Sequence, residues 1–236
     1  MTAADPCFLT VAEAASLIAA KQLSPVELTR AYLDRIERLN GTLHAYVRVL
    51  HDQALTAARM ATEEISAGHY RGPLHGVPIG LKDIYDTAGV PTEGGSKLCL
   101  GRIPASDATT TTLLKKAGAI LLGKLTTWEF AIGGTAFDTP FPPARNPWNV
   151  ERDPAGSSSG SGAAVAAGLC AAAMGSDTGG SDPLARRLVR PRRAKAELWP
   201  GQPCRDHAPV VQSRPCRPAD LDGGGCGNHA AGGSRA

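Results

Sequence analysis

The stretch from Gly156 to Ser181 constrains this chain more than any other, because it is dense in glycine and serine and yet must be buried. It reads GSSSGSGAAVAAGLCAAAMGSDTGGS, with six serines around an alanine-rich run that is apolar enough to pack in a core. Glycines at this density allow backbone conformations with positive φ and let a substrate approach the main chain closely. Successive N–H groups in the closing Gly-Gly-Ser turn can converge on an anion, as an oxyanion hole requires. A serine at the end of this turn is therefore a candidate nucleophile.

A candidate base, Lys82, lies 75 residues before Ser157. The segment GVPIGLKD places this lysine at the end of an apolar run that is typical of a buried strand. A lysine acts as a base only when it is neutral, and desolvation lowers its pKa. A solvated lysine just after a strand is the ordinary alternative. The serine-rich motif downstream favours the base.

Two other interpretations of GSSSGSG are less favoured. It lacks the G-K-[ST] ending of a phosphate-binding loop. A flexible Gly/Ser linker is also disfavoured, because the apolar run AAVAAGLCAAA follows it directly and must be buried.

Together these motifs resemble the amidase signature family, whose hydrolases use a serine, a cis-serine and a lysine. The resemblance runs from about residue 10 to residue 181 and includes GVPIGLKD, AGAILLGKL, ARNPWN, GSSSGSGAAVAAG and GSDTGGS, in that order. It implies that neutral Lys82 takes a proton from Ser157, the cis-serine, which takes one from Ser181. Ser181 would then attack a carboxamide and form an acyl-enzyme.

The resemblance also implies the surroundings of this catalytic group. The backbone N–H groups expected in the oxyanion hole are those of Thr178, Gly179, Gly180 and Ser181. Ser158 is expected as a hydrogen-bonding neighbour and Asp177 as an acceptor beside the site, and a structural role for either stays open.

No metal or other cofactor is implied. The expected partner is a small-molecule amide, with no nucleic acid and no membrane, and a homodimer is compatible with the resemblance. One alternative is the amidase component of a glutamyl- or aspartyl-tRNA amidotransferase, which would imply partner subunits. The other is a non-catalytic remnant of a disrupted gene.

Local signals predict an α/β fold with one mixed sheet surrounded by helices. Capping boxes at Thr10–Glu13 and Ser24–Glu27 open the first two helices, and Asn40-Gly41 is expected to end the second. The expected helices span residues 11–20, 25–39, 51–66, 109–117 and 161–170. The expected strands span residues 77–81, 119–122 and 171–175.

These elements divide the chain into a helical preface over 1–70, a catalytic α/β part over 71–181 and a tail over 182–236. The net charge of +3 hides a difference between the parts, because residues 1–181 hold 15 basic and 17 acidic residues whereas the tail holds 10 and 5. The tail also contains seven of the eighteen prolines and three of the six cysteines. The composition therefore changes just after the candidate nucleophile.

The sequence departs from the family pattern at Ala155, at Trp128 and throughout the tail, which begins at Asp182. Read one nucleotide out of frame in G+C-rich codons, residues 182–223 can encode a family-like continuation. We therefore hypothesise a frameshift at Ser181/Asp182, a truncated fold, a disordered tail and a chain that is inactive or nearly so as translated. Third codon positions that forbid the displaced reading would contradict this hypothesis.

The tail also imitates two kinds of site. Its cysteines and histidines resemble a zinc site, and its arginines resemble a nucleic-acid surface. A displaced G+C-rich frame produces Arg, Pro, Ala and Gly without selection, so we expect neither. The residues that imitate the zinc site are Cys204, His207, Cys216, Cys226 and His229.

The expected location is the cytoplasm. The N-terminus has neither the basic region nor the apolar region of a signal peptide. No apolar run reaches the roughly 18 residues of a membrane span. Six cysteines at irregular spacing do not suggest a disulfide framework.

Overall fold

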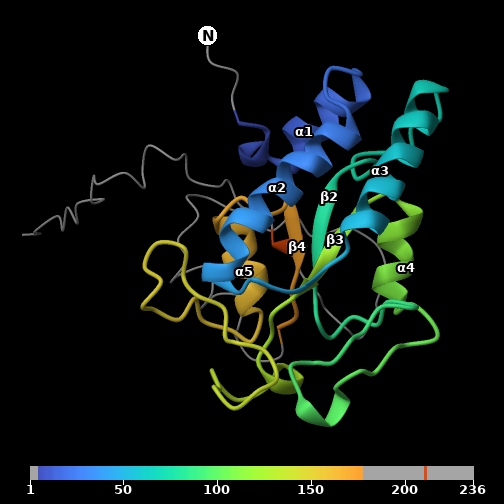
Figure 1. The fold of residues 1–236 in the computed structure, drawn as a ribbon. Coiled ribbons are helices and arrows are strands. Elements are labelled where there is room, and N and C mark those ends of the chain that lie inside the picture. The colour runs from blue at the N-terminus through green and yellow to red at the C-terminus, as the bar shows by residue number, and fades with distance from the viewer. Residues whose placement is uncertain (1–4, 178–209, 212–236) are drawn as a thin grey trace, which may run out of the picture.

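A five-stranded mixed sheet is the centre of the computed structural model, which describes residues 5–177 and 210–211 (Figure 1). The strands, in their order across the sheet, are β1 (Tyr46–Val49), β3 (Ile120–Leu125), β2 (Pro78–Lys82), β4 (Ala172–Met174) and β5 (Val210–Val211). Strand β2 pairs in parallel with β3 and β4, whereas β1 and β5 run antiparallel to their neighbours. The predicted α/β fold with a mixed sheet is confirmed.

The two central strands are buried along their whole length. Every residue of β2 and of β3 is buried, including Lys82 and Lys124. Interior parallel strands covered on both faces need nearly continuous apolar runs rather than alternation. A lysine within such a strand is therefore held away from water.

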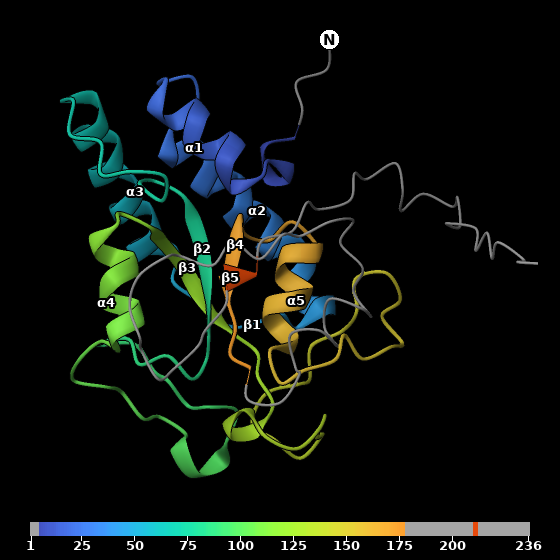
Figure 2. The same ribbon diagram turned by 180° about the vertical axis from the view of Figure 1, so that it is seen from behind.

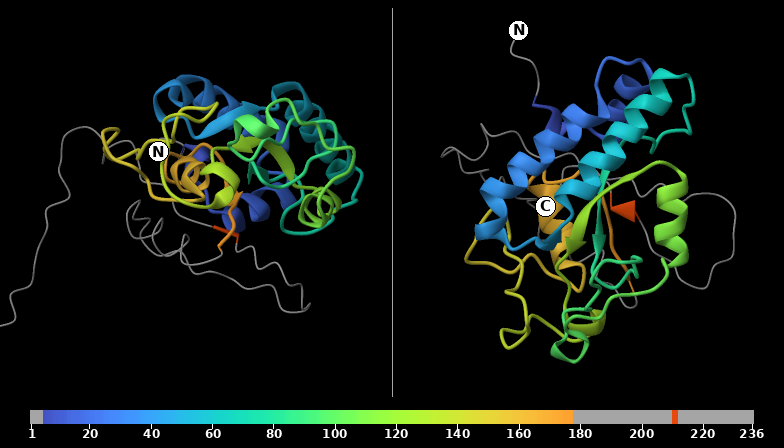
Figure 3. Two further views of the ribbon diagram at one scale, coloured as in Figure 1. Left: turned by 90° about the horizontal axis from the view of Figure 1, so that it is seen from below. Right: turned by 45° about the vertical axis from the view of Figure 1, so that its right-hand side comes forward.

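Helices lie on both sides of the strands. They are α1 (Val11–Ala19), α2 (Pro25–Leu43), α3 (His51–Ser66), α4 (Thr109–Lys116) and α5 (Ser159–Ala166), with short 3-10 turns at Pro6–Phe8, Lys97–Cys99 and Glu129–Ala131. Helices α3 and α4 lie on one side of the strands and α5 on the other (Figures 1 and 2). Helix α2 packs along α3 (Figure 3).

Both predicted capping boxes are confirmed. The Thr10 hydroxyl accepts from the Glu13 N–H at 3.2 Å, and the Glu13 carboxylate accepts from the Thr10 N–H at 2.8 Å. Ser24 and Glu27 form the same reciprocal pair at the start of α2, with Pro25 at the first helical position. These ends form locally, because each N-cap satisfies donors that the helix itself leaves unpaired.

Replacing Ser24 by alanine removes the side-chain acceptor at the start of α2, so we expect the free energy of unfolding to fall by about 1 kcal/mol. Urea unfolding of the Ser24→Ala variant measures this loss. The matched control is Ser66→Ala at the exposed end of α3, where no capping bond is lost. Equal urea midpoints for the two variants would contradict the capping role.

The predicted end of α2 at Asn40-Gly41 is wrong. The helix continues to Leu43, and His44 closes it in the left-handed conformation with φ of 48°. The Asn40 side chain donates to the Tyr46 carbonyl at 3.0 Å and accepts from the Tyr46 N–H at 2.8 Å. Asn40 thus holds the start of β1, a strand that the sequence did not predict, inside the region expected to be a helical preface.

Other boundaries differ from the predictions at both ends of the catalytic region. Strand β3 extends to Leu125, three residues past the predicted end at 122. Helix α5 begins at Ser159 rather than at 161 and stops at Ala166 rather than at 170. Gly168, with φ of 67°, turns the chain toward β4, and only glycine adopts this conformation without strain.

The tail lies outside the described residues except for Val210 and Val211, which pair antiparallel with β4. Its predicted disorder and the frameshift hypothesis therefore remain predictions. In the described part, no helix is long and apolar enough to cross a membrane. Among the described cysteines, Cys7, Cys99 and Cys170 are free of disulfide bonds.

Candidate active site

Three serine hydroxyls surround the side-chain nitrogen of Lys82. Lys82 Nζ lies 2.7 Å from Ser157 Oγ, 3.0 Å from Ser158 Oγ and 2.9 Å from Ser176 Oγ. The lysine is 0% exposed and Ser157 is 4% exposed. The protein itself therefore shields Lys82 and Ser157 from water, whereas Ser176 is partly exposed.

The topology of the sheet brings these residues together. Lys82 is the last residue of β2, and Ser176 follows the parallel neighbour β4 by two residues. Parallel strands end at the same edge of a sheet, so the chain leaving β4 passes beside Lys82. Ser157 and Ser158 immediately precede α5, whose first residue is Ser159.

The segment before α5 has an unusual backbone. The Gly156–Ser157 peptide bond is cis, as the resemblance implied, and Ala155 has a φ of 66°. The Trp128 N–H donates to the Ser157 carbonyl at 3.2 Å. A Cβ at Gly156 would collide with the Trp128 indole. Two of the departures from the family pattern, Ala155 and Trp128, thus adjoin the lysine–serine cluster.

Burial makes Lys82 easier to deprotonate. Desolvation lowers the pKa of Lys82 from 10.5 to about 8, and the nearby Asp177 carboxylate partly opposes this change. An ammonium group has three hydrogens, one for each surrounding hydroxyl. Loss of one proton leaves a lone pair that can accept a proton from a serine.

Ser176 is a member of the cluster that the sequence motifs did not single out. Its N–H donates to Ser158 Oγ at 3.1 Å, and the Ser158 hydroxyl donates to the Ser176 carbonyl at 3.2 Å. A signal for it was present, since Ser176 stands in the motif GSDTGGS directly after the predicted strand 171–175. The Gly-Gly-Ser turn that closes the same motif contains Ser181, which is the more obvious candidate for a catalytic serine.

The other expected site residues are described only in part. Lys82, Ser157 and Ser158 come together, and Asp177 lies close enough to influence the pKa of Lys82. The predicted nucleophile Ser181 and the predicted oxyanion donors lie outside the described residues. Those donors are Thr178, Gly179 and Gly180.

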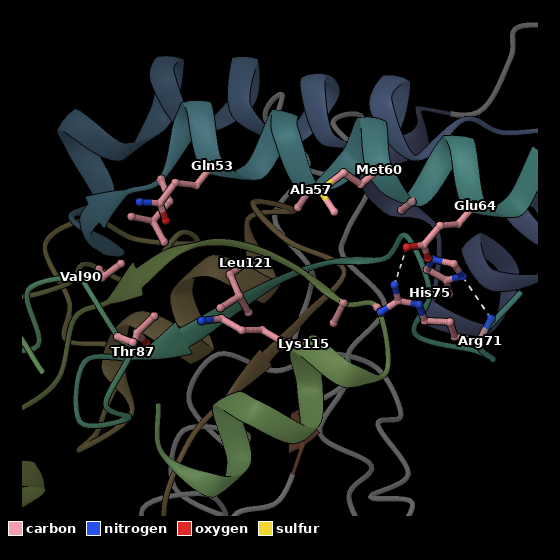
Figure 4. A pocket seen from close by; sticks show the side chains of 15 residues that line it. Gln53, Ala57, Met60, Glu64, Arg71, His75, Thr87, Val90, Lys115 and Leu121 are labelled. Atoms are coloured by element: carbon pink, nitrogen blue, oxygen red, sulfur yellow. Dashed lines mark hydrogen bonds and ion pairs between the residues drawn. The ribbon is translucent and has the colours of Figure 1, made fainter. Parts of the chain in front are cut away.

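A separate cavity of about 250 Å³ lies between α3, α4 and β3 (Figure 4). Leu121, Met60 and Ala57 provide apolar walls, and Glu64 reaches His75 and Arg71 at one end. Lys82 and the serines do not line this cavity. Within residues 5–177, no group of three or more His, Cys, Asp or Glu side chains is arranged to hold a metal ion.

The fold and the cluster define an α/β protein with a buried lysine–serine site at the carboxyl ends of strands β2 and β4 of a mixed sheet. A model of the Amidase family matches residues 27–182. The chain therefore belongs to the amidase family, and the resemblance seen in the motifs is confirmed.

Individual relatives agree with this assignment. The A-type subunit of glutamyl-tRNA(Gln) amidotransferase from Acidothermus cellulolyticus is 48% identical over 172 residues, which cover 73% of this chain and 34% of that protein. Peptide amidase from Stenotrophomonas maltophilia is 38% identical with a TM-score of 0.69, over 75% of this chain and 38% of that one. A fatty acid amide hydrolase is 32% identical with a TM-score of 0.69, over 75% and 31% of the two chains. This chain spans about one third of the length of such curated relatives.

Proposed function

We propose that this chain carries the catalytic group of an amidase that hydrolyses a carboxamide C–N bond through a serine acyl-enzyme. One observation carries the proposal: Lys82 Nζ lies 2.7 Å from Ser157 Oγ, and both residues are buried. A buried lysine held against a serine hydroxyl is an arrangement that can activate a serine when no histidine is used.

In the proposed reaction, neutral Lys82 accepts the hydroxyl proton of Ser157 while Ser157 accepts the proton of Ser181. The Ser181 oxygen bonds to the amide carbon, and backbone N–H groups of residues 178–181 stabilise the resulting oxyanion. The proton returns through Ser157 to the leaving nitrogen as the C–N bond breaks. Water then cleaves the acyl-enzyme and gives a carboxylic acid, with ammonia or an amine as the other product.

Covalent labelling by a fluorophosphonate tests this proposal directly. We expect the probe to modify Ser181, more slowly than in a full-length amidase because of the truncation inferred from the tail, and intact-protein mass spectrometry with peptide mapping identifies the modified residue. A Ser181→Ala variant should not be labelled. Labelling of another serine, or none in the folded parent chain, would favour the non-catalytic remnant instead.

The labelling rate should depend on pH through Lys82. Because burial lowers the pKa of Lys82 to about 8, the neutral base is scarce well below that pH and dominant above it. The rate should therefore rise with pH and level off above about 8. A pH–rate profile measured on the folded chain checks this sign. A profile that is flat across pH 8 or falls there would contradict the role of Lys82 as the base.

A second candidate is the amidase component of a tRNA-dependent amidotransferase. It is favoured by the identities of 44 to 48% to the A-type subunits of glutamyl-tRNA(Gln) amidotransferases from several bacteria. This role predicts that the tagged chain co-purifies with a second protein and with tRNA. Purification of the chain alone from its native host, with labelled Ser181, would favour the independent amidase.

For the independent amidase we propose a small-molecule amide as substrate, the cytoplasm as location, and a homodimer as the assembly to test by light scattering. The truncation and the impaired activity predicted from the tail concern residues 182–236, of which only Val210 and Val211 are described.

A further inference from the structure

A second buried lysine, Lys124 in β3, takes no part in the proposed reaction. It is 0% exposed, like Lys82, and burial lowers its pKa to about 8, although the nearby Asp83 and Asp86 carboxylates oppose this shift. Lys124 stands within the motif AGAILLGKL, for which the sequence indicated no chemical role. A lysine completely enclosed in a strand needs oxygen partners, because an unpaired buried ammonium is costly.

The partners of Lys124 all come from the loop over residues 83–94, which leaves β2 directly after Lys82. Lys124 Nζ donates to the Tyr85 carbonyl, to Thr92 Oγ1 at 2.8 Å and to Thr87 Oγ1 at 3.3 Å. Its ion-pair partner is Asp83, with Nζ 3.7 Å from Oδ1. A single ammonium group therefore cross-links both halves of this loop.

Asp83 also holds the two halves of the loop over residues 83–94 together. Its Oδ2 accepts from the N–H groups of Glu93 at 3.0 Å and of Gly94 at 3.1 Å. The carboxyl group is 1% exposed, and burial raises its pKa to about 6 although Lys124 opposes that shift. Glu93 and Arg102 are further charged groups whose fields act on this pair. The lysine and the aspartate thus each favour the charged form of the other, against the effect of burial.

Tyr85 connects this loop to the lysine–serine cluster. Its carbonyl is held by Lys124, and its hydroxyl donates to the Gly175 carbonyl at 2.6 Å. Gly175 immediately precedes Ser176, whose hydroxyl lies 2.9 Å from Lys82 Nζ. A chain of direct contacts therefore runs from Lys124 through Tyr85 to the strand end beside Lys82.

We propose that Lys124 is a positioning residue, which fixes the loop over 83–94 and, through Tyr85, holds Ser176 against Lys82. The proposal rests on the proposed function in one respect, that Lys82 is the base whose environment matters. Loss of Lys124 should loosen the Tyr85–Gly175 contact and admit water to the cluster. Lys82 then becomes easier to protonate.

The test measures Lys82 itself. Lysine labelled with ¹³C at Cε gives an NMR signal whose pH titration reports each lysine pKa, and Lys82→Met identifies the Lys82 signal. In Lys124→Met, and in Tyr85→Phe, we expect the pKa of Lys82 to rise from about 8 toward 10.5. Lys115→Met is the matched control, because Lys115 forms an exposed pair with Asp107 at 2.7 Å and should leave the Lys82 titration unchanged.

A double variant, Asp83→Asn with Lys124→Met, separates positioning from simple charge neutralisation. It removes both buried charges, so it should regain stability lost by Lys124→Met and still show the raised Lys82 pKa. The proposal is overturned if the double variant restores both the stability of the protein and the Lys82 pKa of about 8. It is also overturned if Lys82 keeps this pKa in folded Lys124→Met. If Lys124→Met does not fold, Tyr85→Phe and the double variant decide by the same criterion.

Fluorophosphonate labelling tests the proposed function independently of the NMR titration, which tests the role of Lys124. Fluorophosphonate labelling that survives Lys82→Met would remove the base role and leave the NMR titration interpretable. A raised Lys82 pKa in the variants would then still establish the link from Lys124 to the cluster.

Discussion

Lys82→Met should reduce the rate of fluorophosphonate labelling at Ser181 by about 10²- to 10⁴-fold, the range usually contributed by a general base. Methionine matches the length and apolar body of the lysine but cannot accept a proton. Lys82 is enclosed by the protein and contacts three serine hydroxyls. Solvent water therefore does not easily replace it as the general base. The measurement is the rate of mass increase of the intact protein under excess probe.

Two further variants make this result specific. Ser157→Ala removes the hydroxyl that we propose to relay the proton from Ser181 to Lys82, so it should also suppress labelling. Lys116→Met changes an exposed lysine in α4 and should label at the parent rate. A Lys82→Met protein that labels as fast as Lys116→Met would show that Lys82 is a structural lysine and not the base.

Gly160→Ala should destabilise the protein, although alanine normally favours a helix over glycine. An added Cβ at this position of α5 would collide with the Ala45 carbonyl oxygen and with the Thr126 nitrogen. Both atoms belong to the backbone and cannot rotate away. Overpacking of this kind costs about 1–3 kcal/mol, and we expect the upper part of that range or more. Urea unfolding followed by circular dichroism measures it.

Gly41→Ala provides the opposite expectation within the same protein. Gly41 lies in α2, and no atom is within 4 Å of its hypothetical Cβ. Alanine should therefore stabilise the helix by up to about 1 kcal/mol. If both variants shift the urea midpoint in the same direction, the close approach of α5 to the backbone at Ala45 and Thr126 is not as the structure describes it.

Local signals in the sequence were sufficient for several elements. The capping boxes at Thr10 and Ser24 predicted the starts of α1 and α2, because a cap is satisfied within four residues of chain. The apolar runs around residues 79 and 121 predicted the buried strands, since interior strands are recognisable by their composition alone. Lys82, Ser157 and Ser158 were found from motifs at family spacing, and the structure brings them within hydrogen-bonding distance.

Local signals were insufficient where a residue is used by a distant part of the chain. The pair Asn40-Gly41 predicts a helix end, but the Asn40 side chain pairs with the backbone of Tyr46 while α2 continues past it. The sequence does not predict β1, because this strand is short and, among the described residues, pairs only with β3, about 75 residues later in the chain. The sequence predicts the start of α5 two residues late because no local signal marks it, and the Ser158 side chain makes no capping bond to the helix.

The residue types needed for the chemistry are readable from the chain itself, because a lysine after an apolar strand and serines among glycines are local patterns. Their convergence is a property of the sheet. Ser176 reaches Lys82 only because β4 lies parallel to β2, and Lys124 reaches Tyr85 only because β3 lies on the other side of β2. The lowered pKa of Lys82 likewise needs walls from several segments, since desolvation depends on every atom that excludes water and not on neighbours in the sequence.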